Sequence, residues 1–171
     1  MKSIVIYFSA ETGKTRKIAE ELAAELGADI FEIKPEQPYT AADIKWTNPL
    51  ARCNKEKLGK KDVPVVGKIG NWDEYDTVYL GFPIWYYGAP NVVNTFCKGY
   101  DWKGKTLHIF ATSGGSGIGK TAEKLAPYVG GQTSQMQRES RLYRRSQFDD
   151  FVIGVARPLN LFYTASGCAE A

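Results

Sequence analysis

The chain has 171 residues, of which 43% are hydrophobic and 24% charged, so it has the length and composition of one folded domain and not of a disordered segment. Its formal net charge is +3, and no run of Lys and Arg forms the basic stripe of a nucleic-acid-binding protein. Cys53, Cys97 and Cys168 lie far apart, which disfavours a metal site and indicates reduced thiols in a cytoplasmic protein. No apolar stretch has the length of a membrane span.

The first element in chain order is an apolar run that starts at Ile4 and is rich in β-branched and aromatic residues. Such a run predicts a strand that is buried on both faces. After Thr15 the apolar residues recur every four positions between Ile18 and Leu26, which is the period of a helix, and Gly27 ends it. The unit is therefore a strand, a hydroxyl-rich loop and a helix.

The loop between this strand and helix has the features of a phosphate-binding site. Gly13 lets the backbone approach a ligand closely, and the free N–H groups of the first helical turn carry a partial positive charge. Three hydroxyl groups add donors, so a cup of donors forms at the helix start. The candidate residues are Ser9, Ala10, Glu11, Thr12, Gly13, Lys14 and Thr15. The alternative is an ordinary strand-to-helix turn with Thr12 as the N-cap.

Residues 28–33 predict a second short strand, and residues 35–70 form a long connection. A connection of this length usually holds structure of its own or a function. Thr40 is placed to cap a short helix, and the pair Asn48 and Pro49 is a second helix-start signal. The lysine-rich residues that follow are expected to form a solvated face.

The strand predicted at residues 77–82 runs into three consecutive aromatic residues between Pro83 and Pro90. Pro83 stops the strand and Pro90 can begin the next helix, so the rings lie at the carboxyl end of a strand, where open α/β sheets bind ligands. Flat side chains at this place suit stacking on a flat heterocycle. The candidate residues are Pro83, Ile84, Trp85, Tyr86 and Tyr87. The alternative is that one or two of these rings only close the edge of the sheet.

A further strand, predicted at residues 106–111, opens into a glycine-rich loop. His108 lies inside this strand between apolar neighbours, so we expect it to be structural and not catalytic. The backbone of the loop is free to lie along a ring edge and to donate N–H groups to carbonyl oxygens and ring nitrogens. The candidate residues are Thr112, Ser113, Gly114, Gly115 and Gly117.

Residues 114–121 also match the nucleotide-binding P-loop pattern, Gly-x-x-x-x-Gly-Lys-Thr, between a strand and a helix. Taken alone, the match predicts an ATPase or GTPase. Against it, the P-loop normally follows an early strand, whereas almost the whole predicted sheet precedes this loop. No later apolar strand ends in an Asp that could hold magnesium, and the aromatic turn would have no role. A P-loop nucleotide hydrolase is therefore kept only as an outsider.

All three loops follow strands of a β-α-β series, so they share one edge of a parallel sheet. A phosphate cup, aromatic faces and backbone donors together fit flavin mononucleotide (FMN), which has one phosphate and one flat polar heterocycle. The runs Ser-x-x-Thr-Gly-x-Thr from Ser9, Pro-Ile-Trp from Pro83 and Thr-Ser-Gly-Gly-Ser-Gly-Ile-Gly from Thr112 resemble those of the bacterial flavodoxin-like FMN-binding proteins. Further similarity lies at Pro38, Tyr39, Thr40, Arg52, Asn54 and Glu56.

This resemblance covers residues 1 to about 128 and implies an α/β, flavodoxin-like three-layer sandwich with a parallel sheet of order 2-1-3-4-5. It also implies that residues 9–15 hold the FMN phosphate and that residues 83–87 contact the isoalloxazine. Residues 112–117 would close over the ring from the other side. No catalytic side chain is demanded, because the flavin carries the chemistry.

Three positions depart from the family pattern. Lys14 stands where Asn is usual, which adds a positive charge beside the phosphate. Tyr86 stands where a second Trp is common, a change that keeps stacking but affects flavin affinity and potential. Glu11 places an acidic residue in the phosphate loop, and we expect it to point outward.

We expect a single domain over residues 1–171, with its core in the first 128 residues and an atypical segment at 129–171. The family has a fifth strand soon after this point and then a closing helix. Here residues 130–147 are polar with little periodicity, and residues 151–156 have the pattern of a strand. A long insertion before the fifth strand and a disrupted reading frame near residue 130 are both compatible with this pattern.

Two classes of function follow from a bound FMN. One is an electron carrier that exchanges electrons with a redox partner protein. The other is an NAD(P)H-dependent quinone oxidoreductase that reduces a small-molecule acceptor. The sequence has no second dinucleotide fingerprint, which favours the carrier, but the formal charge of +3 lacks the acidic surplus of carriers that dock on basic partners.

Overall fold

The structure, a computed structural model, describes residues 2–10, 13–114 and 117–130, together with the backbone of residues 142–144 and 151–153. Its centre is a sheet in which four parallel strands follow the order β2-β1-β5-β6. These strands are β1 (Lys2–Tyr7), β2 (Asp29–Glu32), β5 (Tyr75–Pro83) and β6 (Thr106–Ser113). This is the order expected for the first four strands of the flavodoxin-like sheet, and the predicted fold class is confirmed.

The place beside β6 differs from the expectation. There β8 (Phe151–Ile153) runs antiparallel to β6, and β7 (Leu142–Arg144) runs antiparallel to β8. Within the strand predicted at residues 151–156, the described part 151–153 is a strand, but it is antiparallel and not a fifth parallel strand. The polar segment predicted at 130–147 and the rest of the tail lie almost wholly outside the described residues.

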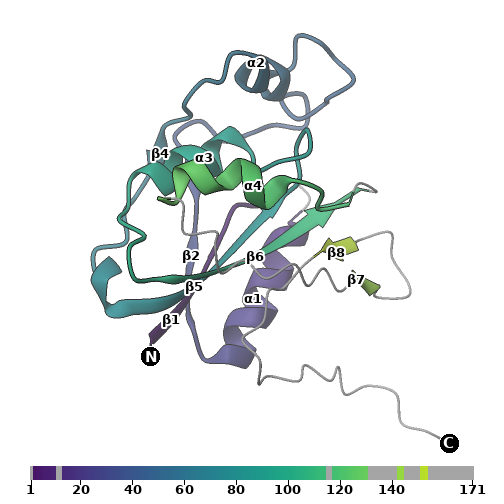
Figure 1. The fold of residues 1–171 in the computed structure, drawn as a ribbon. Helices are drawn as coiled ribbons and strands as arrows, with labels where there is room; N and C mark the ends of the chain where they lie inside the picture. Colours follow the sequence, from purple (N-terminus) through teal and green to yellow (C-terminus); the bar gives the residue numbers. More distant parts are fainter. Residues whose placement is uncertain (1, 11–12, 115–116, 131–141, 145–150, 154–171) are drawn as a thin grey trace, which may run out of the picture.

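Helices cover both faces of the sheet (Figure 1). One face carries α1 (Lys14–Leu26), and the other carries α3 (Asn91–Lys98) and α4 (Thr121–Leu125) with the 3₁₀ turn η2 (Ala126–Tyr128). Because the side chains of a strand alternate between its two faces, β1, β5 and β6 each contribute to two separate cores. No helix in the described part of the chain is long and apolar enough to cross a membrane.

The smaller core lies under α1 and includes Ala19, Ala23, Tyr79 and Phe110. His108, on β6, is buried on the same face and stacks on Tyr79 with ring centroids 4.9 Å apart. The stacked position beneath a helix agrees with a structural role and lies away from the loops at the strand ends. The larger core, on the other face, fills the space beneath α3 and α4 with aliphatic and aromatic side chains.

The long connection contains a two-stranded pair, β3 (Lys34–Pro35) with β4 (Val65–Val66), one helix, α2 (Arg52–Leu58), and, beyond it, the 3₁₀ turn η1 (Trp72–Glu74). The helix predicted at Thr40 is only a turn. The Asp43 carboxylate accepts from the Thr40 N–H and hydroxyl, and the Thr40 hydroxyl accepts from the Asp43 N–H, which closes the turn after four residues. The start predicted at Asn48 and Pro49 is three residues early. Asn48 forms a turn instead: its side chain accepts from the Leu50 N–H and its carbonyl from the Ala51 N–H.

Candidate functional site

Thr112 ties together the three loops at the carboxyl edge of the sheet. Its hydroxyl lies 2.9 Å from the hydroxyl of Thr15, at the start of α1, and both residues are buried. Its carbonyl accepts a hydrogen bond of 2.8 Å from the N–H of Ile84, in the aromatic turn. The predicted convergence of the three loops is therefore present, and one β6 residue fixes their spacing.

The loop after β1 offers an open backbone at the start of α1. Gly13 has φ 68°, in the left-handed region, and a Cβ added there would meet no atom within 4 Å. Gly13 is also the N-cap of α1, one residue after the Thr12 that the alternative interpretation placed there, and no side chain of a described residue caps the helix. The first turn of α1 thus directs its backbone N–H groups toward a loop without a side chain at Gly13, as a phosphate cup requires.

The other predicted residues of this loop differ in their surroundings. The Ser9 hydroxyl donates to the carbonyl of Ala10 at 3.4 Å, and Lys14 is exposed. The Thr15 hydroxyl faces Thr112, so its geometry serves the link between loops. Glu11 and Thr12 lie outside the described residues, and their predicted roles stay predictions.

The loop after β5 is a tight hairpin turn with unusual backbone. Trp85 and Gly88 exchange two backbone hydrogen bonds of 2.9 and 3.1 Å across the turn. The two residues between them, Tyr86 and Tyr87, have φ values of 52° and 60°. Positive φ at both central positions is the requirement of a type I′ turn, which usually uses Asn and Gly there. Two tyrosines in this conformation hold their rings at defined positions at a cost in strain.

The ring of Trp85 belongs to an aromatic cluster. It meets Phe8 and Tyr39 edge to face, with centroid distances of 5.7 and 5.2 Å. Such contacts add about 1 kcal/mol beyond the buried area. The Trp85 ring is therefore partly used in packing, as in the alternative in which one or two of the three rings only close the edge of the sheet. Tyr87, by contrast, is 69% exposed and is available to a ligand or partner.

A polar chain holds Tyr39 from the other side. Its hydroxyl donates to Glu56 at 2.5 Å, and the Arg52 Nε donates to the other Glu56 oxygen at 2.6 Å. The Arg52 guanidinium also lies over the Tyr39 ring, 4.3 Å from its centroid. Burial, and then the hydrogen bond to Glu56, raise the pKa of Tyr39. The segments around Tyr39 and Arg52, noted from the sequence for their family likeness, thus meet beside the aromatic turn.

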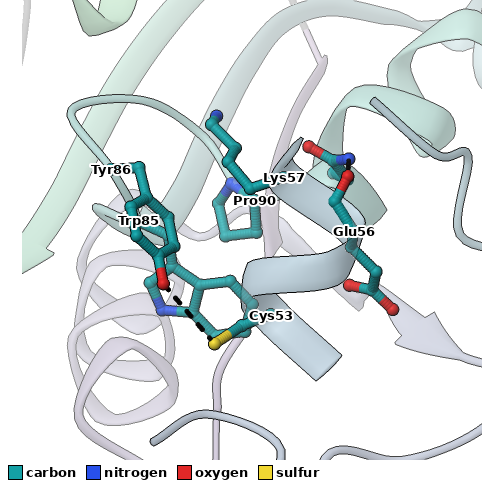
Figure 2. Close-up of a pocket in the computed structure, with 7 residues that line it drawn as sticks. Cys53, Glu56, Lys57, Trp85, Tyr86 and Pro90 are labelled. Carbon is teal, nitrogen blue, oxygen red and sulfur yellow. Dashed lines mark hydrogen bonds between the residues drawn. The ribbon is translucent and has the colours of Figure 1, made fainter. Parts of the chain in front are cut away.

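Helix α2 lies beside the turn, with Cys53 facing Tyr86 (Figure 2). The Tyr86 hydroxyl lies 3.8 Å from the sulfur of Cys53, and burial followed by this contact raises the pKa of Tyr86 to about 12. Between them is a cavity of about 10 Å³, which has room for about one water and not for a flavin. The residues that line it are Cys53, Glu56, Lys57, Trp85, Tyr86, Pro90 and Asn91.

Two lysines reach the same turn. The Lys124 amine, from α4, lies 3.4 Å from the carbonyl of Tyr86, and a Cβ on Gly88 would lie 3.6 Å from the Lys57 amine. Lys57 is half-buried, so it does not belong to the solvated face expected for the lysine-rich run. Burial first, and the charge of Lys124 second, lower the pKa of Lys57. Sequence reasoning missed both lysines and Cys53, because no periodic signal links α2 to a turn some thirty residues later.

The glycine-rich loop after β6 presents open backbone. Gly114 and Gly117 are exposed, and a Cβ at either would meet nothing within 4 Å, while Gly115 lies outside the described residues. The P-loop interpretation finds no support here. Thr121, whose hydroxyl would have to reach magnesium, is fully buried in the first turn of the five-residue α4.

A doubly wound α/β sheet whose carboxyl edge joins a helix-start glycine loop, an aromatic turn and a glycine-rich loop defines a nucleotide-cofactor-binding protein. Comparison with known proteins makes the class specific. The family model for flavodoxin matches residues 2–147, and the chain belongs to the flavodoxin family.

Solved structures agree with this assignment. A candidate flavoprotein from Bacteroides eggerthii is 45% identical, with a TM-score of 0.71 over 75% of this chain and 82% of its own. One from Bacteroides uniformis is 40% identical, with a TM-score of 0.70 over 75% and 84%. A Lactobacillus acidophilus flavoprotein in complex with FMN shares the fold at 23% identity, with a TM-score of 0.61 over 76% and 87%. No protein with a curated functional description matches the chain.

Proposed function

We propose that the chain binds FMN without a covalent bond and exchanges electrons through it with a redox partner protein. The observation that carries this proposal is the Thr112 link, because it brings a phosphate cup, aromatic faces and backbone donors to one edge of the sheet. The family match and the FMN complex of a structural neighbour support FMN as the cofactor.

The residues present fit this cofactor. Gly13 has no side chain at the helix start, and no described atom lies within 4 Å of the place where a Cβ would be, so a phosphate can approach the backbone there. Trp85, Tyr86 and Tyr87 supply flat faces for the isoalloxazine, and the backbone at Gly114 and Gly117 is open to its polar edge. When bound, FMN supplies one- and two-electron redox chemistry. The chain binds and orients it, and excludes water through the aromatic cluster.

The carrier is preferred to the NAD(P)H-dependent quinone oxidoreductase because of the turn. A reductase needs room for a nicotinamide to stack over the flavin. The rings of Tyr86 and Tyr87, held by a turn with two cross-turn hydrogen bonds, compete for that space. A carrier needs only an exposed flavin edge and a surface on which a partner can dock.

The test has two stages. First, FMN and ATP-Mg are titrated separately into the purified protein while tryptophan fluorescence is followed. We expect saturable quenching by FMN alone. Second, the FMN-loaded protein is mixed with NADH or NADPH and a soluble quinone, and the nicotinamide absorbance is recorded. Quenching by ATP alone would refute FMN binding, and turnover of about 1 per second or faster would replace the carrier with a reductase.

A further inference from the structure

The positive charge of the chain is concentrated in one segment. Residues 40–62 contain six Lys or Arg and three Asp or Glu, so their formal charge of +3 equals that of the whole chain. The other 148 residues carry 16 charges of each sign. The three carboxylates of the segment are already engaged: Asp43 caps the turn at residue 40, Glu56 binds Arg52, and Asp62 accepts from Lys98.

The same segment exposes large apolar side chains. Trp46, Leu50 and Leu58 are 72%, 73% and 85% exposed, which is more than any other large apolar residue in the described part of the chain. The backbone that carries Trp46 is fixed by Asn54, whose amide donates to the backbone carbonyls of Trp46 and Asn48 at 3.0 and 2.7 Å. Leu58 follows Asn54 by four positions on α2, which places the two on one side of the helix.

This surface is continuous with the aromatic turn. Lys57, between Asn54 and Leu58 on α2, reaches Gly88, where it comes close to Lys124 of α4. The exposed ring of Tyr87 lies 5.9 Å from the Lys124 amine. Neither lysine forms an ion pair with a described residue, so two like charges face each other beside the proposed flavin site. Among the described residues no carboxylate is paired with either amine, so an acidic group on a partner would relieve their repulsion.

We propose that this surface is a docking face for an acidic redox partner protein. The docking face consists of Trp46, Leu50, Leu58, Tyr87, Lys57 and Lys124. Its exposed aromatic and aliphatic groups, with a basic surround, have the composition of a protein interface with electrostatic steering. A partner seated there would lie against the turn that covers the flavin. The inference rests on the proposed electron-carrier function and adds the charge sign and the location of the partner.

A redox protein that exists in two charge forms provides the probe. Native cytochrome c is basic, and succinylation of its lysines makes it acidic while the haem is kept. The FMN-loaded protein is reduced with dithionite, freed of excess reductant without oxygen, and mixed with either ferric form. Each transfer moves one electron to the haem iron, Fe(III) becomes Fe(II), and two cytochromes reoxidise one protein. The rate is followed at the haem band over a range of ionic strength.

We expect the rate with the acidic form to fall as salt rises, and the rate with the native form to rise, because screening weakens attraction and repulsion alike. Since succinylation also changes the haem potential, the sign of the salt dependence is the decisive quantity. The double substitution Lys57→Glu with Lys124→Glu should lower the rate of electron transfer to the acidic form about tenfold at low salt. The matched control is the double substitution Lys68→Glu with Lys103→Glu, which changes the net charge by the same amount. Both lysines are exposed, and Lys103 precedes β6 at the opposite edge of the sheet.

A second measurement locates contact without electron transfer. In ¹⁵N-labelled oxidised protein, paramagnetic ferric succinylated cytochrome c should broaden the Trp46 indole N–H, which is assigned with Trp46→Phe. The indoles of Trp72 and Trp102 are internal controls, because their N–H groups are bonded to the carbonyls of Asp101 and Cys97. Trp46→Ser should weaken the contact without changing FMN affinity.

Several results would overturn the docking face. These are a salt dependence of the opposite sign, equal electron-transfer rates in the Lys57/Lys124 and Lys68/Lys103 double variants, or a Trp46 indole N–H signal that is not broadened. Self-association that Trp46→Ser abolishes, or stronger binding to anionic phospholipid vesicles than to the acidic cytochrome, would also overturn it by naming another occupant. If the protein fails to bind FMN, the proposed function fails by itself, and the Trp46 measurement on the flavin-free protein still tests the face.

Discussion

The loops after β1 and β5 both contain left-handed backbone, but they use opposite residues to form it. In the first, Gly13 adopts φ 68° without strain, and the space above it is open. In the second, Tyr86 and Tyr87 adopt φ 52° and 60°, where each costs about 1–2 kcal/mol relative to glycine. The comparison indicates that glycine is used where a ligand needs the backbone. Where the side chain itself is needed, a non-glycine residue with strained backbone is used instead.

The strain at the second loop is offset by its surroundings. Two cross-turn hydrogen bonds join Trp85 to Gly88, and Cys53 holds the Tyr86 hydroxyl. Lys124 approaches the Tyr86 carbonyl from the other side. In the first loop the Gly13 N–H and the Ser9 hydroxyl both donate to the Ala10 carbonyl, and Thr15 is tied to Thr112. The following variants test this division of roles.

The largest effect is expected from Gly13→Val. A β-branched residue is strained at φ 68°, and its side chain would fill the open space where the phosphate would bind. We expect the FMN dissociation constant to rise at least about 100-fold, which corresponds to about 2.8 kcal/mol. The measurement is a fluorescence titration with FMN.

Lys120→Ala is the matched control for that change, because Lys120 is the P-loop lysine of the outsider interpretation and is exposed at the start of α4. An exposed charge of this kind contributes little, so its effect on FMN affinity should stay within about threefold. A greater loss from Lys120→Ala than from Gly13→Val would restore the nucleotide-triphosphate interpretation.

The next effect concerns the bond that joins the loops. Thr112→Val removes one of two buried hydroxyls and leaves that of Thr15 without its partner, at a cost of about 1–3 kcal/mol in unfolding free energy. In the double variant Thr15→Val with Thr112→Val both partners are apolar, so much of that loss should be recovered. Urea unfolding of the parent, Thr15→Val, Thr112→Val and the double variant gives the coupling energy. Strictly additive losses would show that the two hydroxyls do not act as a pair.

The sequence predicts the four central strands, α1 and the position of the three loops, because each has a local signal: a short apolar run, apolar residues every four positions, or glycine and proline. It does not predict the direction of β8, which depends on pairing across the sheet. The Cys53–Tyr86 contact joins residues 33 positions apart, and the start of α2 at Arg52 depends on bonds made by Asn48. Such contacts leave no periodic signal.

The left-handed backbone of the aromatic turn is also not predictable from the sequence. The run Trp85-Tyr86-Tyr87-Gly88 contains no Asn-Gly or Asp-Gly signal for a type I′ turn, so only its aromatic content and its prolines were informative. The positions of the three loops are therefore predictable from the sequence, and the contacts that α2 makes with the aromatic turn are not.

A smaller effect separates ring from backbone at Tyr87. Tyr87→Gly removes the exposed ring and relieves the strain, whereas Tyr87→Ala removes the same ring and keeps the strain. We expect the glycine variant to be more stable than the alanine variant by about 1 kcal/mol in urea unfolding. Both should bind FMN more weakly than the parent. Equal stability of the two variants would mean that the turn relaxes to another conformation once the ring is gone.

The smallest effect concerns Lys57, whose pKa is lowered by burial and by the nearby charge of Lys124. A lysine with a depressed pKa destabilises the folded state below that pKa, and this cost disappears as the pH rises toward the ordinary lysine value of about 10.4. Lys57→Met should therefore raise the unfolding free energy at neutral pH by a few tenths of a kcal/mol, since a half-exposed charge is well screened. The advantage over the parent should shrink as the pH approaches 10. Ionisation of the tyrosines affects both proteins alike and cancels in the difference, and Lys103→Met provides the control for a lysine far from the turn.

If Lys57→Met is instead less stable at neutral pH, the lysine stem contributes packing that outweighs the charge. If it is more stable but reacts more slowly with the acidic cytochrome, the chain retains a destabilising charge pair because a partner requires it.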